Sequence, residues 1–131
     1  MTRIESEKMV VNNPATDVFI FLNDFNNFQK FMPEQVTNWA STSDDCSFTI
    51  QGMAKLTMKF AEKIPYTELQ IVPNGKAPFD FKLYCMIEDQ GAASAVQLLF
   101  DADLNPFLKM MAEKPLRNFL NLLVKKLPEV F

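Results

Sequence analysis

The side chains best suited to acid–base chemistry are two aspartates, Asp101 and Asp103. Two carboxylates spaced i, i+2 on a strand share one face and could serve as a general acid and a general base. They alternate out of phase with Phe100 and Leu104, so we expect both to face water. The chain has no histidine, which removes the commonest general base and the usual partner of a nucleophilic serine or cysteine.

The cysteines and tyrosines add little to a catalytic hypothesis. Cys46 and Cys85 lie far apart with no second ligand pair, so we expect buried, reduced thiols and neither a zinc site nor a disulfide. Tyr66 and Tyr84 could donate to the polar head of a ligand, although Tyr84 shares the predicted wet face of its strand with Lys82. We therefore assign no catalytic residue, no metal site and no cofactor.

Charge argues against one class of partner. The 13 basic and 16 acidic side chains give a net charge of −3, which offers no reason to expect a nucleic-acid phosphate partner. The charge is uneven, because residues 105–131 carry five basic and two acidic groups. A solvated helix face explains this excess most simply, and an anionic membrane surface is the alternative.

Length and hydropathy bound the organisation of the chain. The 131 residues are expected to form one domain, 1–131. The first residues lack an apolar export segment, and no apolar run reaches the length of a membrane span. We therefore expect a cytoplasmic protein without an integral membrane segment.

Hydrophobic periodicity predicts the order of elements. Residues 3–12 read as a strand, and Asn13 and Pro14 can open a helix that is followed by a second short helical turn ending before Pro33. From residue 36 the period becomes two, which predicts six strands joined by tight turns. The turns are marked by residues 41–45, Gly52, Asn74-Gly75 and 89–91, and one of the strands follows Pro78.

The longest helical pattern covers 105–127. Asn105 and Pro106 form a start signal, because an Asn side chain can accept from unpaired amides and proline is tolerated at the first helical position. Apolar residues at three- and four-residue steps predict one buried face, made of Leu108, Met111, Ala112, Pro115, Leu116, Phe119, Leu122 and Leu123. Pro115 lies inside this pattern and should kink the helix, either to follow the sheet or to open a cavity mouth.

This order resembles the helix-grip superfamily, often labelled SRPBCC, which includes START lipid-transfer domains, pollen-allergen-like proteins and polyketide cyclases. The resemblance rests on Asn13-Pro14-Ala15 before an amphipathic helix, on the segment 24–28 after it, and on the terminal helix opened by Asn105-Pro106. It implies an α+β fold in which a curved antiparallel sheet of about seven strands grips the C-terminal helix. Two short helices follow the first strand.

The resemblance also implies an apolar cavity between sheet and helix that binds a hydrophobic small molecule, such as a lipid, an isoprenoid or a polyketide-like metabolite. Its expected walls are Phe48, Met58, Phe60, Phe81, Leu83, Phe100, Met111 and Phe119. A ligand pocket should exceed about 300 Å³, and a smaller void would favour a groove for a protein partner or a transient membrane contact. A cyclase- or hydrolase-type enzyme is the other hypothesis.

Overall fold

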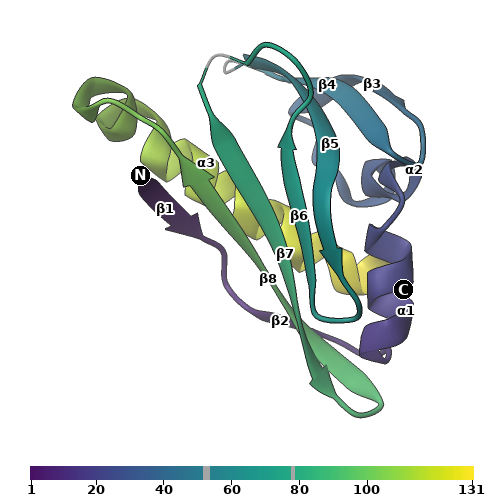
Figure 1. Cartoon of the computed structure of the whole chain (residues 1–131). Helices are drawn as coiled ribbons and strands as arrows, with labels where there is room; N and C mark the ends of the chain where they lie inside the picture. Colours follow the sequence, from purple (N-terminus) through teal and green to yellow (C-terminus); the bar gives the residue numbers. More distant parts are fainter. Residues whose placement is uncertain (52–53, 78) are drawn as a thin grey trace.

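The computed structural model describes residues 1–51, 54–77 and 79–131. Its centre is a curved antiparallel sheet of eight strands that holds a long C-terminal helix (Figure 1). The predicted α+β helix-grip architecture is therefore confirmed. Gly52 and Pro78, which the sequence places beside predicted turns, lie outside the described residues.

The sheet is a meander in the order β1-β8-β7-β6-β5-β4-β3, with β2 paired beside β1 on β8. Tight turns force neighbouring strands to be antiparallel, and Gly75 and Gly91 take the positive φ values of 92° and 80° that two of these turns require. The strands are β1 (Thr2–Glu5), β2 (Met9–Val11), β3 (Val36–Ser41), β4 (Asp45–Ile50), β5 (Ala54–Ile64), β6 (Glu68–Pro73), β7 (Phe81–Gln90) and β8 (Ala93–Ala102).

The predicted first strand is two strands, which accounts for eight instead of about seven. Both β1 and β2 pair with β8, but the chain leaves the regular ladder between them. Buried Ser6 occupies the break, where its hydroxyl accepts from the Leu98 amide at 2.9 Å and its carbonyl accepts from the Gln97 side chain at 2.9 Å. These side-chain bonds satisfy polar groups that a continuous ladder would otherwise pair.

Two short helices cover one end of the concave side of the sheet. Helix α1 is Ala15–Leu22, α2 is Phe25–Phe28, and a 3-10 turn, η1, continues over Gln29–Phe31. The N-cap of α1 is Pro14 without a side-chain hydrogen bond, so the predicted capping role of Asn13 is wrong. The Asn13 carbonyl instead accepts from the Ser94 hydroxyl at 3.0 Å, which ties the turn before α1 to β8.

The long helix α3 (Pro106–Lys126) starts where the sequence predicts, because the Asn105 side chain accepts from the Leu108 amide at 2.8 Å. A 3-10 turn, η2 (Leu127–Val130), follows it. The helix runs diagonally along the sheet from the end of β8 toward α1 (Figure 1). Its buried residues are Leu116, Phe119, Leu120, Leu123 and Val124.

The first half of α3 differs from the prediction. Leu108 and Met111 were placed on the buried face, but their exposed fractions are 38% and 60%. The buried stripe repeats from Leu116 onward and turns toward Leu120 and Val124, so the periodicity is real but begins later in the helix. The buried residues of α3 begin at Leu116, and Ala112 in the first half is partly buried against the core.

Candidate functional site

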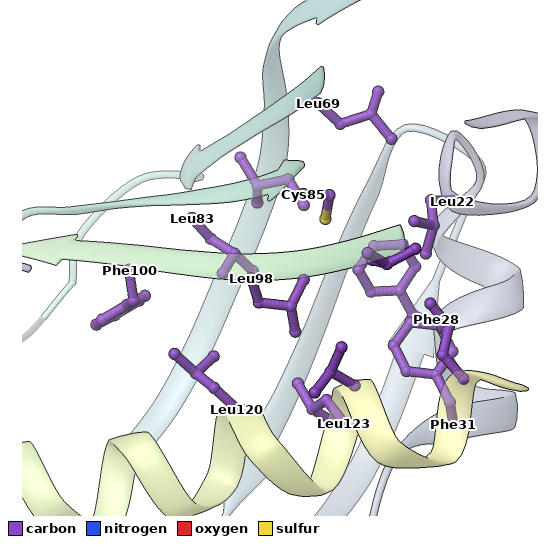
Figure 2. Packing of buried hydrophobic residues seen from close by; sticks show 14 of the residues in the cluster. Leu22, Phe28, Phe31, Leu69, Leu83, Cys85, Leu98, Phe100, Leu120 and Leu123 are labelled. Carbon is purple, nitrogen blue, oxygen red and sulfur yellow. The ribbon is translucent and has the colours of Figure 1, made fainter. Parts of the chain in front are cut away.

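An apolar cavity of about 50 Å³ lies between the sheet and the second half of α3. Figure 2 shows Leu120 and Leu123 of α3 pointing toward Leu98 and Phe100 of the sheet, with Phe28 and Phe31 closing the side. All of the lining side chains are apolar or, in one case, a thiol: Leu22, Phe28, Phe31, Met32, Phe48, Ile50, Leu56, Met58, Leu83, Cys85, Leu98, Phe100, Leu116, Phe119, Leu120, Leu123, Val124 and Leu127.

Five of the eight predicted wall residues meet at this cavity. They are Phe48, Met58, Leu83, Phe100 and Phe119. Four of them point inward because alternate strand residues share one face, and Phe119 faces them from α3.

The other three predicted wall residues lie elsewhere. The ring of Phe60 stacks on Phe25 with centroids 4.2 Å apart, beside a register shift in β5. Phe81 is buried but stacks on Phe100 at 5.1 Å, beyond the edge of the cavity. Met111 is 60% exposed on the first half of α3. Strand or helix phase identifies a face, but it does not show how far along that face a cavity extends.

Sequence reasoning missed the wall contributed by α1, α2 and η1. Leu22, Phe28 and Phe31 follow one another at six- and three-residue steps, and all three line the cavity. Their spacing was visible as a helical pattern, but its orientation depends on how the short helices pack on the sheet. The sequence analysis also missed Leu120, because the buried face that it predicted for α3 is rotated about the helix axis relative to the face that is buried in the structure.

The ionisable group in the described cavity wall is the thiol of Cys85. Burial raises its pKa to about 12, because an apolar environment disfavours the thiolate. Cys46 is also buried, and desolvation raises its pKa to about 12. Both cysteines are free and buried, as predicted. At neutral pH a protonated thiol is a poor nucleophile and a poor base.

The aspartate pair offers no acid–base site. Asp103 is exposed, whereas Asp101 pairs with Arg3 across β1 and β8 through two hydrogen bonds of 2.7 and 2.8 Å. These bonds lower the pKa of Asp101 below its usual value, because they favour the carboxylate. The Arg3 guanidinium also lies 5.5 Å from the ring centroid of Tyr84. Asp101 is thus occupied by an ion pair outside the cavity.

The cavity is smaller than the sequence-based hypothesis requires. Ordinary ligand pockets begin near 300 Å³, and this void is about 50 Å³, so the prediction of a preformed, ligand-sized cavity is wrong. Large side chains from the sheet, the short helices and α3 fill most of the space between sheet and helix. A ligand the size of a fatty acid would need the walls to move.

Comparisons with known proteins identify the fold. No family model matches the chain, and no curated protein matches it. Solved structures do match: XoxI from Bacillus cereus has a TM-score of 0.78 at 12% identity, covering 100% of this chain and 96% of its own. A START superfamily protein from Mycobacterium smegmatis has a TM-score of 0.70 at 12% identity, covering 98% and 99%.

A third similar structure comes from a larger protein. The di-domain ARO/CYC BexL of the BE-7585A biosynthetic pathway has a TM-score of 0.68 at 17% identity, covering 95% of this chain and 46% of BexL. Identities at this level show the fold alone. Within the described residues, no helix is both long and apolar enough to cross a membrane.

Proposed function

We propose that this chain, which has a START/SRPBCC-like helix-grip fold, binds a hydrophobic small molecule between its sheet and the second half of α3. The observation that carries the proposal is the apolar void at the position where the sheet grips the helix. Its described lining contains no charged side chain. An apolar compound would therefore enter without leaving a buried ion unpaired, whereas a polar metabolite would lose its hydrogen bonds to water.

The size of the void alone favours a groove for a partner or a transient membrane contact, so the proposal rests on the apolar lining and on the energetic cost of the empty space. At roughly 24 cal/mol per Å³, an empty volume of 50 Å³ lowers the free energy of unfolding by about 1 kcal/mol. Larger side chains at one or two positions of the cavity wall would fill the void and remove this loss of stability. An apolar ligand would recover it by restoring the missing contacts.

Enlargement of the void is required, and the wall contains side chains suited to it. Met32 and Met58 line the cavity, and methionine changes rotamer readily because its chain is unbranched. On the opposite side the cavity is bounded by the second half of α3, from Leu116 onward. Enlargement on this side therefore requires these packed residues to move.

An enzyme of the cyclase or hydrolase type is less well supported. It would need a titratable group in the cavity with a pKa matched to proton transfer. The Cys85 thiol, with its pKa near 12, does not meet this requirement. The remaining hypothesis, a membrane or protein interface, is favoured by a separate surface of α3, the exposed apolar residues at its start.

Native mass spectrometry of gently purified protein tests the proposal, together with titration by cis-parinaric acid, a fluorescent fatty acid. We expect a co-purified apolar ligand or saturable probe binding at micromolar concentration. This affinity is what remains when the cost of association is subtracted from the free energy gained by burying apolar surface. Unlabelled apolar compounds should displace the probe, and polar metabolites should not. Absence of both a bound ligand and saturable binding would refute the proposal.

A matched pair of variants locates the binding site. Cys85→Leu adds apolar volume at a wall residue and should weaken probe binding by at least about tenfold, since little free volume would remain. Cys46→Leu makes the same chemical change at a buried thiol outside this wall and should leave probe binding within a factor of about two. Equal effects of both changes would place the probe elsewhere.

A further inference from the structure

The first two turns of α3 project into solvent. Every residue of 106–111 is exposed, and four of these six are large and apolar. The exposed fractions are 64% for Phe107, 38% for Leu108, 76% for Met110 and 60% for Met111. Figure 1 shows this start of α3 at a corner of the molecule, beside the end of β8.

These side chains are not needed to hold the helix on the sheet. At 100° per residue they spread over an arc of about 160° of the helix surface, so they form a broad apolar face instead of a narrow seam. Single exposed apolar residues are ordinary, but a contiguous group of this kind marks an interaction surface. We call residues 106–111 the α3 tip.

The charges beside the tip are two lysines of α3 and, just before the helix, the exposed carboxylates of Asp80 and Asp103. Lys109 lies within the tip on the helix side opposite the middle of the apolar arc, and Lys114 lies one turn further along the face that carries Met110 and Met111. The only acidic side chain of α3 is Glu113, whose carboxylate pairs with Arg117 at 3.3 Å. Lys109 and Lys114 form no ion pair within the described parts of the chain. The tip therefore combines apolar surface with two available ammonium groups, although the protein as a whole is acidic.

This combination fits an anionic bilayer better than a second copy of the chain. A two-fold dimer through the tip would place identical surfaces together and bring the lysines of both copies close to one another. At a bilayer, the same lysines would extend toward anionic headgroups while the neighbouring apolar side chains enter the acyl boundary. A projecting end can be surrounded by lipid, whereas a flat protein partner would cover one side of it.

We propose that the α3 tip docks on an anionic lipid surface, with Phe107, Met110 and Met111 entering the bilayer interface and Lys109 and Lys114 contacting headgroups. This docking site is separate from the cavity and does not depend on the binding of a small molecule there. It requires no change in the fold, because the tip is already exposed.

Vesicle sedimentation tests the proposal with the full chain. We expect binding to vesicles of phosphatidylcholine mixed with phosphatidylserine, and binding at least about tenfold weaker to phosphatidylcholine alone, because the lysines favour anionic headgroups. Added salt should weaken the binding by screening these contacts. The double variant Phe107→Ser/Met110→Ser should bind the mixed vesicles at least about tenfold more weakly, because it removes the apolar contacts.

Matched controls separate the tip from general stickiness. Ile20→Ser changes an apolar side chain of α1 that is also 64% exposed, and it should leave vesicle binding unchanged. Lys109→Gln/Lys114→Gln should abolish the preference for anionic lipid, whereas the same changes at the exposed Lys55 and Lys59 of β5 should not. All of these sites are exposed, so the variants should keep the unfolding transition of the parent protein.

Three results would overturn the proposal. The first is no sedimentation of the full chain with the anionic vesicles, and the second is an equal loss of binding in the Ile20 control. The third is a stable dimer in sedimentation velocity that Phe107→Ser/Met110→Ser dissociates, which would assign the tip to self-association. Failure of the small-molecule proposal is distinguishable, because Cys85→Leu should leave vesicle binding intact.

Discussion

Filling the cavity at Cys85 should raise the stability of the protein. Cys85 is 1% exposed on β7 and borders the void of about 50 Å³. Leucine is larger than cysteine by roughly two methyl groups, which is comparable to the empty volume. If the added atoms occupy the void, the free energy of unfolding should rise by about 1 kcal/mol, from 24 cal/mol per Å³ of cavity removed.

Urea denaturation followed by circular dichroism measures this change. The midpoint should rise with an unchanged slope, which would show that stability changed and the surface exposed on unfolding did not. Thermal unfolding should shift upward by about 4 °C, as expected for about 1 kcal/mol in a domain of this size. Cys46→Leu should not stabilise the protein, because Cys46 does not border this void.

A loss of stability in Cys85→Leu would refute the reasoning. Insertion of a larger side chain into a filled core forces neighbours out of their rotamers and costs about 1–3 kcal/mol. Such a loss would mean that the space beside Cys85 is already occupied. The same substitution would then be a poor test of ligand binding.

Three further predictions concern the edges of the site. Arg3→Met should reduce the free energy of unfolding at pH 7 by less than about 1 kcal/mol, as expected for an exposed ion pair. The pKa of Asp101 is lowered in the folded state. The difference in stability between variant and parent should therefore be present above about pH 4 and disappear as the pH falls below it. A pH-independent difference in urea midpoints would contradict this. Phe119→Ala should cost about 2–4 kcal/mol, somewhat less than the usual cost of about 3–5 kcal/mol for a buried aromatic residue, because Phe119 already borders a void. Met111→Ala should change the free energy of unfolding by no more than about 0.5 kcal/mol. Similar urea midpoints for the two variants would contradict the assigned burial. Pro115→Ala should slow amide hydrogen exchange in residues 108–115, because it restores a donor to the Met111 carbonyl and removes a costly helix-interior proline; unchanged exchange would show that Pro115 does not loosen the first half of α3.

Local sequence signals predicted most of the fold. The Asn105 cap, the positive φ of Gly75 and the alternation through β4 and β7 each act over a few residues, and each is present in the structure. The break between β1 and β2 was not predictable in the same way. It depends on Ser6 meeting the backbone of Leu98, a contact between segments that are distant in the sequence.

The candidate site was predicted by face but not by extent. Phe81 has the inward phase of Leu83, yet its ring stacks on Phe100 beyond the cavity. The volume of a cavity depends on how complete side chains interlock, and periodicity contains no information about that fit. The helical repeat of α3 likewise could not show where along the helix the sheet stops covering it.

The two proposed sites share one helix, and this makes their independence measurable. Six residues between 116 and 127 line the cavity, whereas 106–111 form the exposed tip, and Pro115 lies between these two segments. If docking of the tip shifts α3, enlargement of the cavity becomes easier, and a ligand in the cavity must then strengthen docking by the same factor, because coupling between equilibria is reciprocal. Probe affinity measured with and without anionic vesicles gives one factor, and vesicle affinity measured with and without probe gives the other. Two equal factors above one would mean that α3 transmits the change, whereas two factors of one would mean that the segments on either side of Pro115 act independently.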